Sequence, residues 1–396
     1  MEVNKRLIYK LIDDKIDDIY ELRYLNEQEL NTLYHALNLN HSLKILNLSY
    51  NKKIKDITLL CKSLKNNSCL QKLYLYFNTI KDITPLKFLN NYCLEELYLN
   101  NNTIKDIISL KFLSNSCLKI LDLSRNKIED ITPLKFLNNS CLEELHLNYN
   151  KIEDITPLKF LSNSYLKILD LSDNQIENIS PIKFLSNSCI KTLELRGNKI
   201  KDITPLKFLS NSCLEYLGLS ENKIEDITPL KFLENNSCLK KLNLGCNQIK
   251  DITPLKYLSN SCLKALNLYV NQVKDISPLK CLKNNSCLEH LNLSFNNIED
   301  LYLLKYLSNS CLKELRLSDN KIEDITPLKF VENNHCLKYL DLSKNKIKDI
   351  TPLKYLSNSC LKTLDLKSNQ INNQDKQKII ELSIELSILK QIHLII

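Results

Sequence analysis

The chain has 396 residues, of which 43% are hydrophobic and 25% charged, and its formal net charge is +8. This apolar content excludes a disordered chain, and no apolar stretch reaches the ~18 residues of a membrane-spanning helix. The 54 basic and 46 acidic residues are interleaved along the chain, whereas nucleic-acid-binding proteins cluster their basic residues. The sequence therefore disfavours nucleic acid as a partner and predicts no membrane association.

Residues 1–40 predict an N-terminal helical cap. Apolar residues recur there at helical spacing: Leu7, Ile8, Leu11, Ile12, Ile16 and Ile19. Asn26 and Glu29 have the spacing of a capping box, ahead of a second helix that reaches Leu37. Charges of both signs through the first turns exclude a secretory signal, so we expect a cytoplasmic protein.

Residues 41–371 repeat a segment of 24 or 25 residues, with one asparagine kept in register fourteen times from Asn51 to Asn369. Each turn reads Cys-Leu-x-x-Leu-x-Leu-x-x-Asn-x-Ile-x-Asp-Ile-Thr-Pro-Leu-Lys-Phe-Leu-Ser-Asn-Ser, with small variations. The alternation in Leu121-Asp122-Leu123 is typical of a strand with one buried face, and stacked turns predict a parallel sheet. We expect each asparagine amide to hydrogen-bond backbone groups of its own and the neighbouring turn.

The pattern Leu-x-x-Leu-x-Leu-x-x-Asn-x-Ile, met from about Leu43 to Ile371, resembles the leucine-rich-repeat family. Its short period is similar to phosphatase-regulatory and internalin-type repeats, and residues 30–43 look like the longer ribonuclease-inhibitor type. The resemblance implies an α/β solenoid, a horseshoe or arc with a parallel concave β-sheet and short convex helices. It also implies a non-catalytic module that binds a protein partner through the concave face.

All ten prolines occupy one column of the repeat, each directly after Thr or Ser. This step predicts that the hydroxyl caps a short helix that begins at the proline. An aspartate column stands five positions before a lysine column, Lys87 through Lys354. We interpret the two columns as a solvated convex face, with aspartate near each helix N-terminus. Binding of phosphate or nucleic acid by the lysine row is the alternative.

Twelve of the fifteen cysteines also share one column, and none belongs to paired Cys-x-x-Cys motifs of a zinc site. Their side chains would point in parallel ~5 Å apart, whereas a disulfide needs Cβ atoms ~3.8 Å apart. We expect small, semi-buried hydrophobes at the entry to each strand, and Cys246, outside the column, is the best candidate for a reactive thiol. The six scattered histidines and three glycines predict no catalytic residues, metal site or cofactor.

Binding residues are predicted at the outward strand positions, where the turns differ most from one another. The predicted set is Tyr50, Tyr74, Tyr76, Phe77, Tyr98, Asp122, His146, Asp170, Glu194 and Arg196. Aromatic side chains beside charges are typical of interface anchors. The alternative is that tyrosine simply fits a pleated surface. A weaker cluster comprises Tyr269, Val270, His290 and Phe295, with Arg316 beyond it.

Residues 372–396 predict a C-terminal cap, with a helix over 375–386 and a last strand over 389–394. The apolar edge of that strand would allow homo-association. An alternative function is a regulatory or substrate-receptor subunit of a phosphatase or ubiquitin ligase. The Asn-, Lys- and Ile-rich composition without tryptophan resembles proteins of AT-rich genomes, such as protists and giant viruses. For a viral protein the expected location is the host cytoplasm.

Overall fold

The computed structural model describes residues 8, 10–11, 18–19, 22–89, 93–114, 116–138, 141–162, 164–186, 188–259, 261–307, 311–332, 334–356, 360–372, 374 and 393–395. The chain divides into two compact units, unit 1 (Met1–Asn198) and unit 2 (Lys199–Ile396). None of the helices in these ranges combines the length and the apolar character that crossing a membrane requires.

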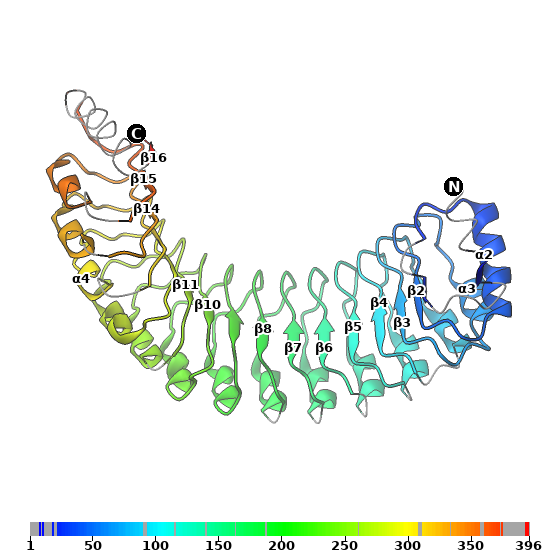
Figure 1. The fold of residues 1–396 in the computed structure, drawn as a ribbon. Coiled ribbons are helices and arrows are strands. Elements are labelled where there is room, and N and C mark those ends of the chain that lie inside the picture. The colour runs from blue at the N-terminus through cyan, green and yellow to red at the C-terminus, as the bar shows by residue number, and fades with distance from the viewer. Residues whose placement is uncertain are drawn as a thin grey trace. The chain divides into compact units, whose positions relative to one another are not determined.

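A parallel sheet runs through each unit, because every turn contributes one short strand that pairs with the strand of the next turn (Figure 1). Unit 1 holds β1 (Asp18–Ile19), β2 (Ile45–Asn47), β3 (Lys72–Tyr74), β4 (Glu96–Tyr98), β5 (Ile120–Asp122), β6 (Glu144–His146), β7 (Ile168–Asp170) and β8 (Thr192–Glu194). Unit 2 holds β9 (Tyr216–Gly218), β10 (Lys241–Asn243), β11 (Ala265–Asn267), β12 (His290–Asn292), β13 (Glu314–Arg316), β14 (Tyr339–Asp341), β15 (Thr363–Asp365) and β16 (His393–Ile395). Equivalent residues face each other, as Leu97 faces Leu121, so the predicted parallel sheet is confirmed.

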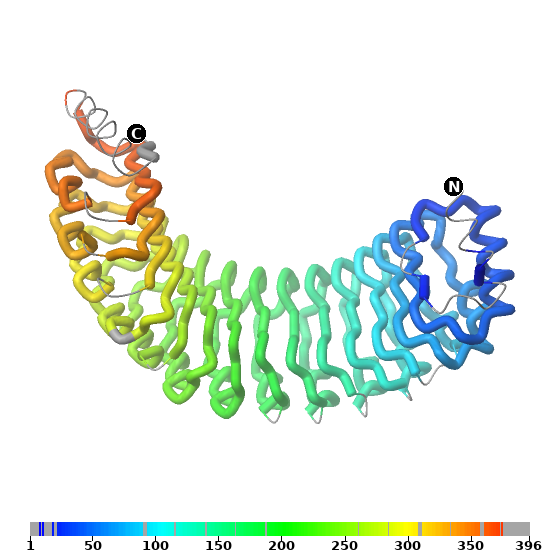
Figure 2. Tube along the Cα trace, in the orientation of Figure 1, coloured from blue at the N-terminus to red at the C-terminus, as the bar shows by residue number. Residues whose placement is uncertain are grey.

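Short helices form the opposite side of each turn from the strands, and in Figure 2 successive turns of each unit lie side by side. Unit 1 has α2 (Glu27–Leu39), α3 (Thr58–Ser63), η1 (Thr84–Phe88), η2 (Ile108–Leu113), η3 (Thr132–Leu137), η4 (Thr156–Leu161) and η5 (Ser180–Leu185). Unit 2 has η6 (Thr204–Leu209), η7 (Thr228–Leu233), η8 (Thr253–Leu258), η9 (Ser277–Asn284), α4 (Leu304–Leu307), η10 (Thr326–Val331) and η11 (Thr351–Leu356). The elements labelled η are 3-10 helices.

The prediction that a threonine or serine hydroxyl caps these helices is wrong. The Thr132 side chain makes no cap hydrogen bond, and Thr132 is already the first helical residue. Its backbone N–H donates to Oδ1 of Asp130 at 2.7 Å. Every described 3-10 helix that follows an aspartate of this column repeats this bond, as at Thr84 and Asp82. A carboxylate two residues back reaches this N–H, so the aspartate column provides the cap and its predicted place at the helix N-terminus is confirmed.

The core of each turn is a layer of leucine and isoleucine between the strand and the helix. Leu121, Leu123 and Ile128 have no exposed surface, and their equivalents along the chain are buried in the same way. Burial of one such side chain stabilises the fold by ~1.5–3 kcal/mol. In most strands the residues on either side of the buried leucine are half exposed, and together these positions form what we call the sheet face of each unit.

An asparagine ladder joins successive turns. Nδ2 of Asn126 donates to the carbonyl oxygens of Leu99, in the preceding turn, and of Leu123, in its own turn, both at 3.0 Å. Its Oδ1 accepts the N–H of Ile104 in the preceding turn, also at 3.0 Å. The predicted role of the asparagines is therefore confirmed. The turn before Asn247 contains one extra residue, yet Oδ1 of Asn247 still accepts the N–H of Ile224 in the preceding turn at 3.0 Å.

The N-terminal part confirms the capping box but corrects one helical residue. Asn26 and Glu29 accept each other's backbone N–H at 2.9 Å, and α2 begins directly after Asn26. Ile19, placed on a helix by its spacing, lies in β1 opposite Leu46 of β2. Helical spacing does not show where a helix ends, and pairing with the edge of β2 places Ile19 in a strand.

At the C-terminal end, β16 pairs with β15, and His393 lies opposite Thr363. The predicted last strand is thus found at His393 and Leu394, and β16 extends one residue further, to Ile395. The helix predicted over 375–386 and residues 389–392 of the predicted strand lie outside the described residues.

Candidate functional site

Five aromatic side chains form a continuous cluster on the sheet face of unit 1, which we call the aromatic patch: Tyr50, Tyr74, Tyr76, Phe77 and Tyr98. Tyr74 stacks on Tyr98 with ring centroids 4.7 Å apart, since their strands place them opposite each other. Tyr50 stacks on Phe77 at the same distance. Tyr76 contacts Tyr50 and Tyr74 edge-on, at 5.6 and 6.4 Å, and so links the two stacks.

Two members of the patch occupy the residue that directly precedes the ladder asparagine, where the chain turns out of the strand. Tyr50 has φ 60° and Phe77 has φ 54°, in the left-handed region that few non-glycine residues adopt. This conformation presents their rings beside the strand residues, and 41% of the Phe77 surface remains exposed. The guanidinium of Arg23 lies over the Tyr50 ring, 4.5 Å from its centroid.

Glu96 provides the polar centre of the patch. It accepts the hydroxyl protons of Tyr74 and Tyr98 on Oε2, at 3.3 and 3.2 Å, and pairs with Nζ of Lys72 at 2.7 Å through Oε1. Burial, and then the Glu96 charge, raise the pKa of both tyrosines, so their hydroxyls stay protonated at neutral pH. The hydrogen bond to Glu96 raises the pKa of Lys72. The rings are therefore fixed both by stacking and by a shared carboxylate.

A predominantly acidic row continues from the patch along the same strand position. Asp122 of β5 lies opposite Tyr98 of the neighbouring strand β4. The same position is occupied in the next strands by His146, Asp170 and Glu194. His146 lies 3.3 Å from Glu144 through Nε2.

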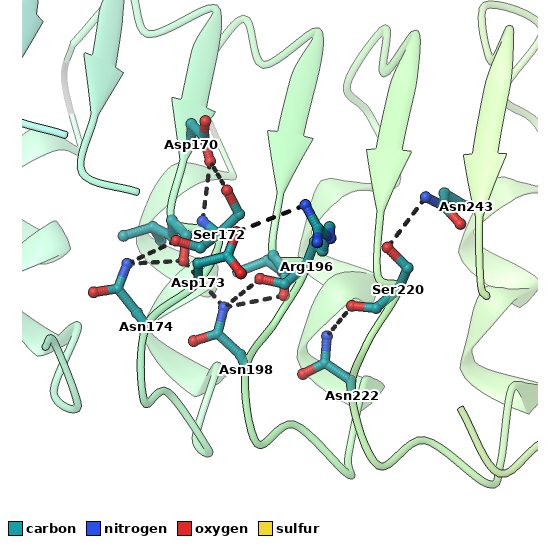
Figure 3. A network of polar contacts seen from close by, with 11 residues as sticks. Asp170, Ser172, Asp173, Asn174, Arg196, Asn198, Ser220, Asn222 and Asn243 are labelled. Atoms are coloured by element: carbon teal, nitrogen blue, oxygen red, sulfur yellow. Dashed lines mark hydrogen bonds and ion pairs between the residues drawn. The ribbon is translucent and has the colours of Figure 1, made fainter. Parts of the chain in front are cut away.

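Backbone and side-chain contacts fix the far end of this row (Figure 3). Asp170 accepts the Ser172 N–H at 3.0 Å and its hydroxyl at 2.6 Å. Arg196 pairs with Asp173 at 3.8 Å, near the ladder residues Asn174 and Asn198. The structure thus places six of the ten predicted residues on the sheet face of unit 1 and the other four, Tyr50, Tyr76, Phe77 and Arg196, just after its strands, while their role in binding stays a prediction.

A hollow of about 270 Å³ on the sheet face of unit 2 was not predicted from the sequence. It lies where Ala265 stands between the larger Lys241 and His290 of the adjacent strands. Asn267 donates to Asn243 at 3.0 Å, and Asn243 donates to the Ser220 hydroxyl at 3.1 Å (Figure 3). A small residue in a column of large ones was the signal that could have revealed it.

The rim of the hollow is charged. His290 and Arg316 both pair with Glu314, and the His290 contact measures 3.0 Å. Tyr269 and Phe295, from the weaker predicted cluster, meet edge-on with centroids 5.2 Å apart.

The cysteine column contradicts the prediction of semi-buried side chains. Nine of its twelve members are exposed, and only Cys238, Cys287 and Cys336 are partly buried. Each cysteine precedes a buried leucine or, at Ile190, a buried isoleucine, so alternation of the extended backbone turns it toward solvent. Cys246 is partly buried, and burial raises the pKa of Cys281 to about 11. Within the described residues, no group of three or more His, Cys, Asp and Glu side chains could hold a metal ion.

Comparisons with known proteins match the chain along most of its length. Models described as leucine-rich repeats match residues 68–200, in four overlapping segments, and residues 39–57 and 357–375. A two-copy leucine-rich-repeat model matches 190–232, 214–257, 288–330 and 309–355. No curated protein matches the chain.

Several solved structures share the fold. An internalin from Listeria monocytogenes is 31% identical, with 86% of this chain and 89% of that chain covered and a TM-score of 0.69. A leucine-rich-repeat protein from Leptospira interrogans is 24% identical, with 99% and 98% covered and a TM-score of 0.76. A plant peptide hormone receptor in complex with RGF2 is 20% identical, with 91% and 61% covered and a TM-score of 0.61.

Proposed function

Because the chain belongs to the leucine-rich-repeat family, whose members are protein-interaction modules, we propose that it is a non-catalytic module that binds a protein partner through the sheet face of unit 1. The observation that carries this proposal is the aromatic patch. Fixed aromatic rings lose little conformational entropy on binding, which is why they often dominate interface energies.

The alternative, that tyrosine merely fits a pleated sheet, does not account for the whole patch. Tyr50 and Phe77 lie outside the strands, at the position before the ladder asparagine where the backbone of each turn is left-handed, so they are not part of the pleated surface. A side chain that only covered the sheet would gain nothing from 41% exposure, as Phe77 has. Exposed rings held in fixed positions are better explained as a contact surface.

The acidic row indicates the chemistry of the partner. Asp122, Asp170 and Glu194 lie along one strand position that begins beside Tyr98, so a protein with an apolar anchor next to basic residues would be complementary. The plant peptide hormone receptor in complex with RGF2 supports a peptide as one form of partner for this fold. We further propose a reducing compartment such as the cytoplasm, because nine thiols of the cysteine column are exposed.

The test is affinity capture from the native cell followed by mass spectrometry. The test variant combines Tyr74→Ala, Tyr76→Ala and Tyr98→Ala. The matched control combines Tyr257→Ala, Tyr306→Ala and Tyr355→Ala, which are also partly buried but lie in helices. Circular dichroism establishes that both variants fold.

A partner retained by the control and lost by the test variant would support the proposal. With that partner purified, each central tyrosine should contribute about 2 kcal/mol, a ~30-fold weaker Kd on replacement by alanine. Equal capture by both variants would contradict the proposal. A captured phosphatase or ubiquitin ligase would identify the chain as a subunit of that enzyme. A second copy of the chain among the captured proteins would indicate the predicted homo-association.

A further inference from the structure

The cysteine column forms a row of regularly spaced thiols within each unit. Every member stands three residues before a strand, and hydrogen bonds between turns begin two residues after it. In unit 2, Lys313 N–H donates to Glu289 O at 2.8 Å, and Lys338 N–H donates to Lys313 O at 2.9 Å. The backbone therefore holds successive cysteines about one strand spacing apart, ~4.8 Å.

The row is longest in unit 2, where seven successive turns carry the residue: Cys213, Cys238, Cys262, Cys287, Cys311, Cys336 and Cys360. Unit 1 carries four in succession, Cys69, Cys93, Cys117 and Cys141, before Tyr165 interrupts the row. Burial, and then the neighbouring Cys311, raise the pKa of the Cys336 thiol, so these two side chains lie close enough to interact. Both Cys311 and Cys360 are exposed and accessible to an ion from solvent.

The spacing of neighbouring thiols decides whether they can form a disulfide, a zinc site or a two-coordinate metal site. A disulfide needs its Cβ atoms ~3.8 Å apart, closer than parallel strands place them. A structural zinc site needs four converging ligands, and no group of even three is available within the described residues. An ion held linearly between two thiolates fits better, because two metal–sulfur bonds of ~2.3 Å span ~4.6 Å.

We propose that adjacent cysteines of this column bind soft monovalent cations, Cu(I) above all, each ion held between the thiolates of two neighbouring turns. Soft thiolate ligands select Cu(I) over harder divalent ions. Binding forms two copper–sulfur bonds and releases two protons to the solvent, while copper stays in the +1 state. Lys313 stands two residues after Cys311; it pairs with Glu289 at 2.7 Å and also interacts electrostatically with Cys311 and Cys336.

The experiment compares two quadruple serine variants that keep the same number of thiols, and both replace Cys189, which stands one turn before Cys213 in the sequence. The alternating variant also replaces Cys238, Cys287 and Cys336, so no two remaining column cysteines of unit 2 are neighbours. The contiguous variant also replaces Cys213, Cys238 and Cys262, which leaves four neighbours in a row. The other cysteines of unit 1 and the three cysteines outside the column are unchanged in both. Each full chain, checked for folding by circular dichroism, is titrated anaerobically with Cu(I) against the competing chelator bathocuproine disulfonate.

The contiguous variant should retain about two more Cu(I) ions per chain than the alternating variant, one for each remaining pair in unit 2. X-ray absorption should find two sulfur neighbours around copper and no nitrogen or oxygen. Equal copper binding by the two variants would overturn the proposal, because adjacency of the thiols would then be irrelevant. Loss of all copper to the chelator by the natural chain would overturn it as well.

Discussion

Replacing Asn126 by aspartate should destabilise the protein more than replacing it by alanine, although aspartate nearly matches asparagine in shape. In the alanine variant, the Leu99 and Leu123 carbonyls still accept hydrogen bonds from Asn102 and Asn150. The Ile104 N–H alone loses the acceptor that the ladder supplied. One buried N–H without a partner costs ~1–3 kcal/mol, and the lost donated bonds bring the total to about 3 kcal/mol.

Aspartate keeps the acceptor for Ile104 but places an oxygen where Nδ2 of Asn126 lies, 3.0 Å from two carbonyl oxygens. A buried charge without a partner costs ~3–5 kcal/mol, so Asn126→Asp should lose about 1–2 kcal/mol more than Asn126→Ala at neutral pH. Burial and the carbonyls raise the pKa of this carboxyl in the folded state. Its penalty should therefore be smallest below the unfolded pKa of ~3.9 and grow as pH rises.

The assay is urea unfolding followed by circular dichroism, at neutral and at acidic pH. Lys127→Ala is the control, because this neighbouring side chain is exposed and its loss should change the free energy of unfolding by less than ~0.5 kcal/mol. Hydrogen exchange at the Ile104 amide gives a local readout. Its rate should rise by more than the change in global stability explains in the alanine variant only. A free energy of unfolding at neutral pH that is equal for the two variants, or higher for aspartate, would refute this account of the ladder.

Three further predictions concern other contacts. Asp251→Ala should lower the free energy of unfolding by ~1 kcal/mol, whereas Asp251→Asn should be nearly neutral, since Asn178 already caps a helix in the same place. Hydrogen bonds from the Thr253 side chain and backbone lower the Asp251 pKa, so the part of this contribution that depends on the charge should be lost as pH falls below ~3.9, whereas Asp251→Asn should show no such loss; urea unfolding across pH checks both points. Glu96→Gln should lower the pKa of Tyr98, because burial and then the Glu96 charge raise it. Ultraviolet titration, with Tyr98→Phe as the reference, measures this pKa; no change would mean that burial alone is responsible. Val270→Asn should stabilise the chain by ~1 kcal/mol, because Val270 has φ 52° and Asn101 tolerates this position in another turn; a lower melting temperature would argue against it.

The sequence was sufficient for features that repeat with a strict period. The strand position of Asp122 and the hydrogen bonds of Asn126 follow from alternation and from the amide's two-sided chemistry, and both are found as predicted. The aromatic patch was assembled from the repeat register alone, because Tyr74 and Tyr98 share one column. What the register could not give was the stacking geometry and the shared hydrogen bonds to Glu96.

The errors arise where two neighbouring residues could serve the same purpose. Asp130 and Thr132 are both good capping residues, and only the backbone geometry decides that the carboxylate takes the N–H. The cysteine column was assigned by residue type, but solvent exposure depends on its place beside a buried leucine. The hollow at Ala265 was missed because a cavity depends on what the surrounding side chains leave unfilled.

The asparagine ladder also bears on how such a chain can change in length. The asparagine of each turn hydrogen-bonds the same two groups of the preceding turn, a leucine carbonyl and an isoleucine N–H. An in-frame duplication of one whole turn would therefore keep these hydrogen bonds between turns. The tolerance of one extra residue before Asn247 shows that these hydrogen bonds do not require turns of identical length. Repeat number can therefore drift by duplication and loss of single turns, at little cost in stability. Selection is then left to act on the outward side chains that each copy carries.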